Sequence, residues 1–146
     1  MIVLVTGGRE FSGIEALERA LTLLRAQVPR EKGLLVVQGG ARGADSIAHG
    51  WAVNMAQAND PPLVRHRTFA ADWLKSRDCA GHTHSRFGSG PCRNARMVSW
   101  VKAALSDHKL VLACPGGTGT DDCVDKALAA GLTVKTLDEV LKEYGP

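Results

Sequence analysis

Three glycine-rich stretches hold the residues whose chemistry is easiest to interpret. They are TGGREF at 6–11, QGGARGAD at 38–45 and PGGTGTDD at 115–122. Glycine lets the backbone adopt a positive φ and places no Cβ in the way of a ligand. Successive backbone N–H groups in such turns can form an anion-binding concavity, to which Thr118 and Thr120 can add hydroxyl donors. One such turn would indicate only a tight connection, whereas three favour a phosphate-binding site.

Two aspartates follow the third glycine turn directly. Asp121 and Asp122 fall in the expected first turn of a helix, where carboxylates are stabilised by the helix dipole and cap free N–H groups. A carboxylate beside a phosphate would repel it, so its natural partner is a ribose hydroxyl or a proton donor. Asp45 has the same two interpretations at the start of its own helix. His49, one turn later, could bond Asp45 or reach the ligand, although a packed or solvent-facing histidine is the commoner outcome.

A further segment, GPCRNARMV at 90–98, adds cationic groups. Arg93 and Arg96 lie three residues apart in the first turn of a predicted helix, so both can point toward one neighbourhood. Because the helix dipole disfavours cations at this end, their presence argues for a partner anion that guanidinium groups bind well. The alternative is a pair of solvated arginines.

Two common nucleotide-binding motifs are missing. The sequence contains no G-x-x-x-x-G-K-[ST], which disfavours a P-loop nucleotidase. GTGTDD lacks the third glycine of G-x-G-x-x-G, which disfavours a conventional dinucleotide dehydrogenase.

Short apolar runs alternate with helical patterns along the chain. The runs predict strands at 2–6, 34–38, 63–69, 110–114 and 133–137. Apolar residues at spacings of three and four, together with a short last segment, predict helices at 13–27, 44–57, 91–105, 120–130 and 138–144. The apolar stripes of the first four helices are Ile14, Leu17, Leu21 and Leu24; Ile47, Trp51 and Met55; Met97, Val98, Val101 and Leu105; and Val124, Ala127 and Leu128.

This alternation is typical of parallel strands joined by right-handed crossovers. We therefore predict an α/β fold: a single Rossmann-like three-layer domain over residues 1–146, with a mainly parallel sheet of about five strands in the order 3-2-1-4-5. The carboxyl ends of parallel strands share one edge of the sheet. The glycine turns, which follow three of the strands, can converge at that edge, where such sheets bind ligands.

Bulk composition narrows the class of protein. The chain has 146 residues, 45% hydrophobic and 23% charged, which suits one globular domain. Its net charge of +3 would help to bind phosphorylated ligands but does not by itself indicate a nucleic-acid-binding protein. No signal peptide and no membrane-spanning apolar run are recognisable, so we expect a cytoplasmic protein. The four cysteines are then expected to be free thiols.

The stretch at 76–90 is long for a loop in a compact domain, which makes a functional lid and a surface insertion equally good interpretations. It contains Cys79, His82 and His84, with Cys92 just beyond. These four side chains could hold zinc. Their spacing matches no common zinc module, so we predict no metal and keep a structural zinc as the alternative.

Five ordered motifs, TGGREF, GGARGAD, ADW at 71–73, GPCRNARM and PGGTGT, together resemble the SLOG superfamily of Rossmann-like proteins. That superfamily includes the LOG-type cytokinin-activating phosphoribohydrolases and the DNA-processing protein DprA. The motifs are most similar to its small YspA/YpsA-related branch of bacteria and phages. The resemblance spans nearly the whole chain.

The resemblance implies a homodimer that binds a nucleotide or nucleotide-derived ligand at the glycine-rich edge, with no cofactor required. The site residues that it implies, together with Thr118 from the third turn, are Gly7, Gly8, Arg9, Gly39, Gly40, Arg42, Asp45, Arg93, Asn94, Arg96, Gly116, Gly117, Gly119, Thr120 and Asp122. If the protein is an enzyme, Asp122 and Arg93 are the candidate catalytic residues.

The chain departs from the LOG pattern at two places. LOG-type hydrolases have PGGxGTxxE with a catalytic glutamate, and Cys123 stands at the matching position here. The segment between ADW and the arginine helix also looks longer than usual, so the outer contacts of the ligand can differ.

Three functions remain open at this stage. The first is a binding protein, as a sensor, sequestering protein or processor, for a phosphorylated, ribose-containing small molecule. The second is an enzyme that cleaves the N-glycosidic bond of a nucleoside 5′-monophosphate. The third is single-stranded DNA binding of the DprA type, which calls for a basic channel and stacking aromatics. Aromatic residues are only 5% of the chain, although Trp73 could stack on a base, so DNA binding ranks third and no membrane partner is expected.

Overall fold

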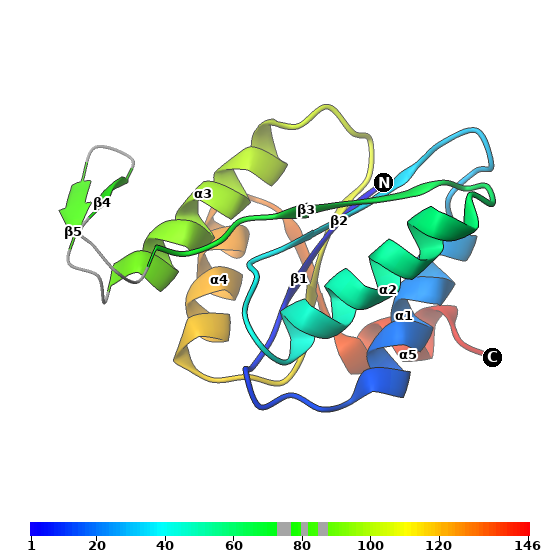
Figure 1. The fold of residues 1–146 in the computed structure, drawn as a ribbon, viewed down its shortest axis with the longest axis horizontal. Coiled ribbons are helices and arrows are strands. Elements are labelled where there is room, and N and C mark those ends of the chain that lie inside the picture. The colour runs from blue at the N-terminus through cyan, green and yellow to red at the C-terminus, as the bar shows by residue number, and fades with distance from the viewer. Residues whose placement is uncertain (73–76, 80–81, 85–87) are drawn as a thin grey trace.

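The computed structural model describes residues 1–72, 77–79, 82–84 and 88–146, with the backbone alone described at 77–79 and 82–84. Its centre is a fully parallel sheet with the strand order β3-β2-β1-β6-β7 (Figure 1). These strands are β1 (Ile2–Thr6), β2 (Leu34–Gln38), β3 (Val64–Thr68), β6 (Lys109–Ala113) and β7 (Thr133–Thr136). The predicted α/β fold and strand order are therefore confirmed, and each predicted strand lies within one residue of its observed bounds.

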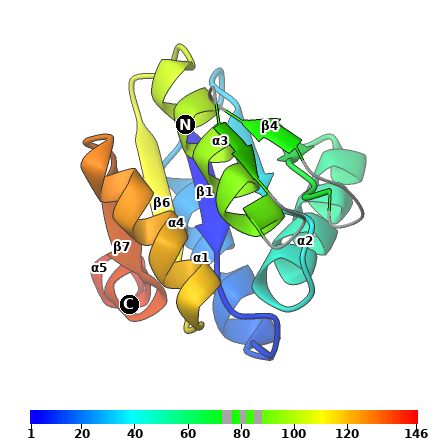
Figure 2. The ribbon, with the colours of Figure 1, turned by 90° about the vertical axis from the view of Figure 1, so that its left-hand side faces the viewer.

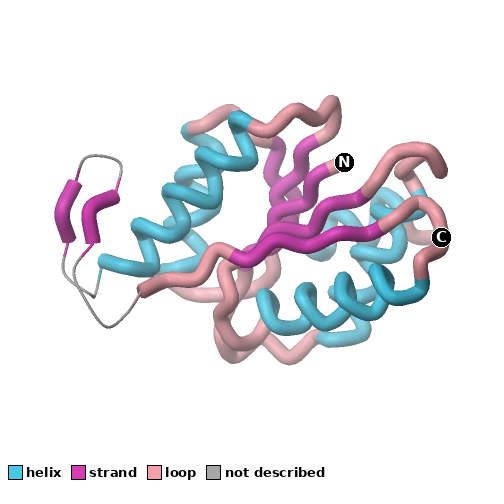
Figure 3. Tube along the Cα trace, turned by 45° about the horizontal axis from the view of Figure 1, so that its top comes forward, coloured by secondary structure: helices cyan, strands magenta, loops and turns pink. Residues whose placement is uncertain are grey.

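Helices cover both faces of the sheet, which gives the three predicted layers (Figure 3). One face carries α1 (Ile14–Ala26), α2 (Ala44–Ala58) and α5 (Leu137–Tyr144). The other face carries α3 (Ser89–Ala103) and α4 (Thr118–Ala129), which pack side by side (Figure 2).

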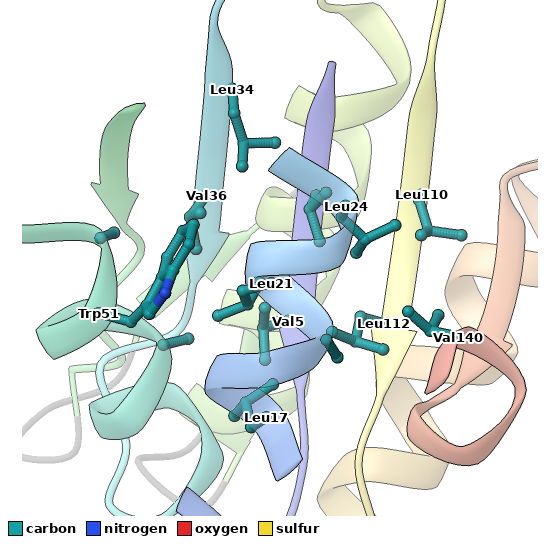
Figure 4. Close-up of a cluster of buried hydrophobic side chains, with 14 of the residues drawn as sticks. Val5, Leu17, Leu21, Leu24, Leu34, Val36, Trp51, Leu110, Leu112 and Val140 are labelled. Atoms are coloured by element: carbon teal, nitrogen blue, oxygen red, sulfur yellow. The ribbon is translucent and has the colours of Figure 1, made fainter. Parts of the chain in front are cut away.

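The central strand β1 is buried on both faces because its side chains alternate between the two helical layers. Val3 and Val5 face the layer of α1, α2 and α5, where Leu17, Leu21 and Leu24 of α1 are fully buried (Figure 4). Ile2 and Leu4 face the layer of α3 and α4. The side chains that meet them there are Val37, Met97, Val98, Val101, Val111, Cys123 and Ala127.

Three residues of the predicted apolar stripes are not buried. Ile14 is 53% exposed at the start of α1, and Leu128 is 57% exposed on the outer side of α4. Leu105 is fully exposed because α3 ends at Ala103, two residues before it. The spacing of apolar residues by three and four positions predicted the helices correctly. It did not predict which residues of each apolar stripe would be buried against the sheet.

The strand order reverses between β1 and β6, which pair in register from Ile2↔Lys109 to Thr6↔Ala113. β2 and β3 lie on one side of β1, while β6 and β7 lie on the other. The turns that follow β1, β2 and β6 therefore meet at one edge, at the lower left in Figure 1. This edge is the place where sheets of this type bind ligands.

The segment predicted as a lid contains an antiparallel hairpin of β4 (Arg77–Cys79) and β5 (His82–His84). It lies apart from the main sheet, beside the start of α3 (Figure 1). The other residues of 73–87, including Trp73, lie outside the described residues, so the lid stays a prediction. Across the described part of the chain, no helix has the length and apolar character that crossing a membrane requires.

Candidate functional site

A cavity of about 530 Å³ lies at the carboxyl edge of the sheet, at the point where the strand order reverses. Its volume falls within the range of small-molecule sites. The lining consists of Thr6, Gly7, Gly8, Arg9, Ala41, Asp45, Gly90, Pro91, Arg93, Asn94, Met97, Gly117, Thr118, Gly119, Thr120 and Asp122. The three glycine turns and the arginine helix therefore meet around one hollow, as the sequence predicted.

The third glycine turn leads into α4, and this helix begins at the cavity without a side-chain cap. Gly117 occupies the N-cap position, and no side chain accepts hydrogen bonds from the first turn. The Asp121 N–H donates to the Gly117 carbonyl at 3.0 Å, so the preceding helical N–H groups, at 118–120, have no partner within the helix. By contrast, α5 starts with a complete capping box between Thr136 and Glu139. The start of α4 is thus a set of N–H donors beside a hollow.

Two glycines of this turn are not required by packing. A Cβ added to Gly117 or to Gly119 would meet no protein atom within 4 Å, and both residues line the cavity. Gly116 differs, since its Cβ would lie 2.6 Å from the backbone nitrogen of Gly8. Gly7 differs in the same way, because its Cβ would lie 2.5 Å from the Cβ of Ala44. Gly117 and Gly119 therefore keep the space beside the helix start open, whereas the other two allow close packing.

In the first two glycine turns, several N–H groups that were expected to be free already have acceptors. The Gly8 N–H donates to the Pro115 carbonyl at 2.9 Å. In the second turn, Gly39 and Ala41 donate to Asp45 Oδ2 at 3.1 and 3.2 Å, and Gly40 donates to Gln38 Oε1 at 2.5 Å. The prediction of three similar backbone cradles is therefore wrong for the second turn, where intramolecular acceptors occupy these donors, and in the first turn the Gly8 N–H is occupied in the same way.

Asp45 thus organises the loop that precedes its helix. Its side chain is 6% exposed, and burial raises the pKa of the carboxyl group, while the Ala41 and Gly39 N–H groups and the Arg93 charge oppose that rise. It lines the cavity, but one of its oxygens is committed to the loop. His49 forms no hydrogen bond with Asp45 and does not line the cavity. Its Nδ1 lies 3.4 Å from Gln38 Nε2, and its ring packs against that of His66.

Arg93 is a buried cation on the wall of the cavity. Its side chain occupies the space where a Cβ of Gly39 would be, and Nη1 donates to the Gly39 carbonyl. Nε donates to Asn94 Oδ1 at 2.9 Å. Burial lowers the pKa of this guanidinium from its usual value, while the charge of Asp45 opposes the shift. These two contacts fix the side chain and leave its remaining N–H groups for a ligand.

Asp122 is held in place from two sides. Asn94 Nδ2 donates to its Oδ2 at 3.0 Å, and Lys126 donates to its Oδ1 from one turn further along α4. Asn94 Nδ2 also donates to the Gly119 carbonyl at 3.1 Å, which ties the start of α3 to the start of α4. An ionised carboxylate can accept several hydrogen bonds, so Asp122 can still receive a ligand hydroxyl at the cavity wall.

Cys123, which stands where LOG-type hydrolases have glutamate, does not reach the cavity. It is fully buried between the sheet and the α3–α4 layer, and burial raises the pKa of its thiol to about 11. Cys114 at the end of β6 is also buried, with its thiol pKa raised to about 12. Both are free cysteines that stay protonated at neutral pH.

Several predicted site residues lie outside this lining. Gly39, Gly40 and Arg42 line a neighbouring hollow of about 380 Å³, and Gly116 lines another next to Gly8. Arg96 is not part of the lining either, and its Nη2 donates to the Ala70 carbonyl at 3.1 Å. The sequence placed both arginines in one neighbourhood, and of the two only Arg93 lines the cavity.

The lining also includes residues that the sequence reasoning had not named as site residues. They are Thr6, Ala41, Gly90, Pro91 and Met97. All five lie inside or directly beside the quoted motifs. Their positions could therefore have been proposed as backbone and apolar walls of the same hollow.

The structure leaves the alternative zinc site untested at three of its four candidate ligands. The side chains of Cys79, His82 and His84 lie outside the described residues, and Cys92 is disulfide-bonded, which removes its thiolate as a ligand. The disulfide also shows that the expectation of free thiols was wrong for Cys92. Elsewhere in the described chain, no three histidine, cysteine, aspartate or glutamate residues are grouped as a metal site would need.

Comparisons with known proteins agree with this architecture. Residues 1–75 match the model of the YspA, cpYpsA-related SLOG family, a match that includes the first two glycine turns. The Gene 61 protein of Mycobacterium phage D29 is 36% identical over 134 residues, which cover 90% of this chain and 92% of that protein. This second similarity extends past the third glycine turn and the arginine helix. On these grounds the chain belongs to the YspA, cpYpsA-related SLOG family.

Proposed function

We propose that the protein binds a nucleotide or nucleotide-derived small molecule, with a phosphate and a ribose, in the cavity at the carboxyl edge of the sheet. The observation that carries the proposal is the start of α4, where uncapped N–H groups and the open glycines Gly117 and Gly119 face one hollow. Helix starts of this kind bind phosphate because free N–H groups and the positive end of the helix dipole act together.

Side chains around the helix start support a charged and hydroxylated ligand. Arg93 brings a guanidinium to the same cavity, which Thr118 and Thr120 also line. The Asp122 carboxylate accepts hydrogen bonds from Asn94 and Lys126. A carboxylate held in this way suits the hydroxyl groups of a ribose, since the paired Lys126 lowers its repulsion toward phosphate.

We propose further that the protein acts as a sensor, sequestering protein or slow processor of this ligand rather than as an efficient phosphoribohydrolase. Glycosidic cleavage needs an acid or base near the leaving group and a carboxylate near the developing positive charge. Cys123 is buried as a protonated thiol and offers neither. Asp122 lines the cavity, but it lies one position before Cys123 and therefore about 100° around the helix from it.

Two measurements test this proposal. Native mass spectrometry of freshly purified protein should reveal a copurified nucleotide or, after addition, binding of AMP, GMP, CMP or UMP. Chromatography of the same mixtures should detect little free base. Asp122→Asn should weaken binding, whereas Asp125→Asn, which changes an exposed aspartate of the same helix, should not.

Fast base release that Asp122→Asn abolishes would overturn the proposal and make Asp122 the catalytic carboxylate of the alternative, an N-glycosidic hydrolase. Fast release that survives this change but is lost in Cys123→Ser would overturn it in favour of thiol chemistry. Absence of binding to any of the four nucleotides and of any copurified nucleotide would reject nucleotide recognition altogether.

A further inference from the structure

A second hollow adjoins the cavity on the side of β2 and β3. It has a volume of about 380 Å³ and shares the lining residues Arg9, Ala41 and Arg93 with the main cavity, so the two are adjacent. We call it the arginine hollow; its lining is Arg9, Gly39, Gly40, Ala41, Arg42, Ala70, Ala71 and Arg93. Three of these residues are arginines, and the rest are glycine or alanine.

The polar side chains that line the arginine hollow are those of its three arginines. The N–H groups of Gly39, Gly40 and Ala41 already donate to Asp45 and Gln38. The glycines and alanines keep the hollow open but supply no polar side-chain atoms. The guanidinium groups are therefore the recognising groups, and guanidinium binds phosphate in a bidentate manner. The main cavity differs, because there the start of α4 supplies backbone donors.

Arg42 can exchange its ion pair with Glu10 for an ion pair with a ligand phosphate. It pairs with Glu10 at 3.0 Å, but the two side chains are 75% and 89% exposed. An exposed ion pair of this kind contributes little to stability, so an incoming phosphate can replace Glu10 at small cost. Arg93, by contrast, is fixed by the Gly39 carbonyl and by Asn94.

We infer that the ligand carries a second phosphate, apart from the one at the start of α4, and that this second phosphate binds in the arginine hollow. The inference rests on the proposed function and refines it. The chemical class is a nucleotide whose two phosphates lie on different parts of the molecule. Nucleoside 3′,5′-bisphosphates and 5′-phosphorylated dinucleotides both have this property.

Titration calorimetry with the full chain tests the inference. The probes are AMP, GMP, CMP and UMP, their 3′,5′-bisphosphates and the 5′-phosphorylated dinucleotides of the same bases. For at least one base, the bisphosphate or the dinucleotide should bind about tenfold tighter than the monophosphate, because one added charge-assisted contact has this size. Comparing the two probes shows which spacing of phosphates the hollow accepts.

Three variants separate the arginine hollow from a general effect of charge. Arg42→Ala should remove most of the tenfold difference between the two kinds of probe. Glu10→Gln should increase that difference by about two- to fivefold, since it removes the competing carboxylate. Arg19→Ala, which removes the same charge from the exposed face of α1, should leave the difference unchanged.

The outcomes distinguish this inference from the proposed function. Binding of a monophosphate with no gain from a second phosphate, or a gain that is equal in Arg42→Ala and Arg19→Ala, overturns the inference alone. Affinity that keeps rising from the dinucleotide to a ten-nucleotide strand also overturns it, because the hollow is then part of a path for single-stranded nucleic acid. Absence of binding to every probe overturns both proposals.

Discussion

Gly119 offers a substitution that should stabilise the protein while it weakens the site. Gly119 lies in the first turn of α4, its φ is not in the left-handed region, and an added Cβ meets no protein atom within 4 Å. Alanine therefore fits the folded chain without strain. Because the same Cβ would project beside the N–H groups that line the cavity, it would stand in the way of a bound phosphate.

The two effects have different sizes and opposite signs. Glycine in a helix is less favourable than alanine by about 0.5–1 kcal/mol, so Gly119→Ala should raise the free energy of unfolding by that amount. For a chain of this length the Tm should rise by about 1–4 °C. Loss of one charge-assisted hydrogen bond to phosphate should weaken binding by about tenfold to a hundredfold.

Gly50 provides the matched control. It lies inside α2, is exposed, and also has open space around the position of a Cβ. Gly50→Ala should raise the Tm to a similar extent and leave binding unchanged. Differential scanning calorimetry and titration with the best-binding nucleoside monophosphate measure both quantities. A Gly119→Ala protein that is more stable and binds as tightly as the unmodified chain would refute the placement of phosphate at this helix start.

Two other predictions follow from buried groups. Arg93→Ala should weaken nucleotide binding by about tenfold to a hundredfold. It should also lower the free energy of unfolding by about 1–3 kcal/mol, because the Gly39 carbonyl and Asn94 lose their donor. Equal urea unfolding of Arg93→Ala and the exposed control Arg19→Ala would contradict this loss of stability. Burial raises the thiol pKa of Cys114 and Cys123 to about 12 and about 11 from an ordinary 9.0, so the unfolded chain binds fewer protons above pH 9. The stability contributed by each thiol is therefore complete below about pH 9 and is lost as pH rises toward those values, by up to about 1.4 kcal/mol per pH unit and thiol. Between pH 8 and 11, the free energy of urea unfolding should fall more steeply for the unmodified chain than for a variant with both cysteines changed to alanine. Parallel declines in the two proteins would contradict this prediction.

The architecture of the main sheet could be predicted from the amino-acid sequence. Alternating apolar runs and helical stripes predicted every strand of the main sheet and its order, because buried parallel strands and amphipathic helices have distinct periodicities. The predicted helix at 13–27, for example, is observed as Ile14–Ala26. The position of the glycine turns at one edge follows from the same topology. The absence of the LOG glutamate at Cys123 is likewise visible in the sequence alone.

The differences between the three glycine turns depend on long-range packing and could not be predicted. Gly39 is a glycine because Arg93, 54 residues away, occupies the space of its Cβ, and Gly7 is one because Ala44 and Cys114 pack against it. Gly119 lies beside open space. In each case the role depends on which distant atoms approach the residue, and local sequence does not encode those atoms. The same holds for backbone N–H groups: whether a turn can hold an anion depends on whether the folded chain has already supplied an acceptor.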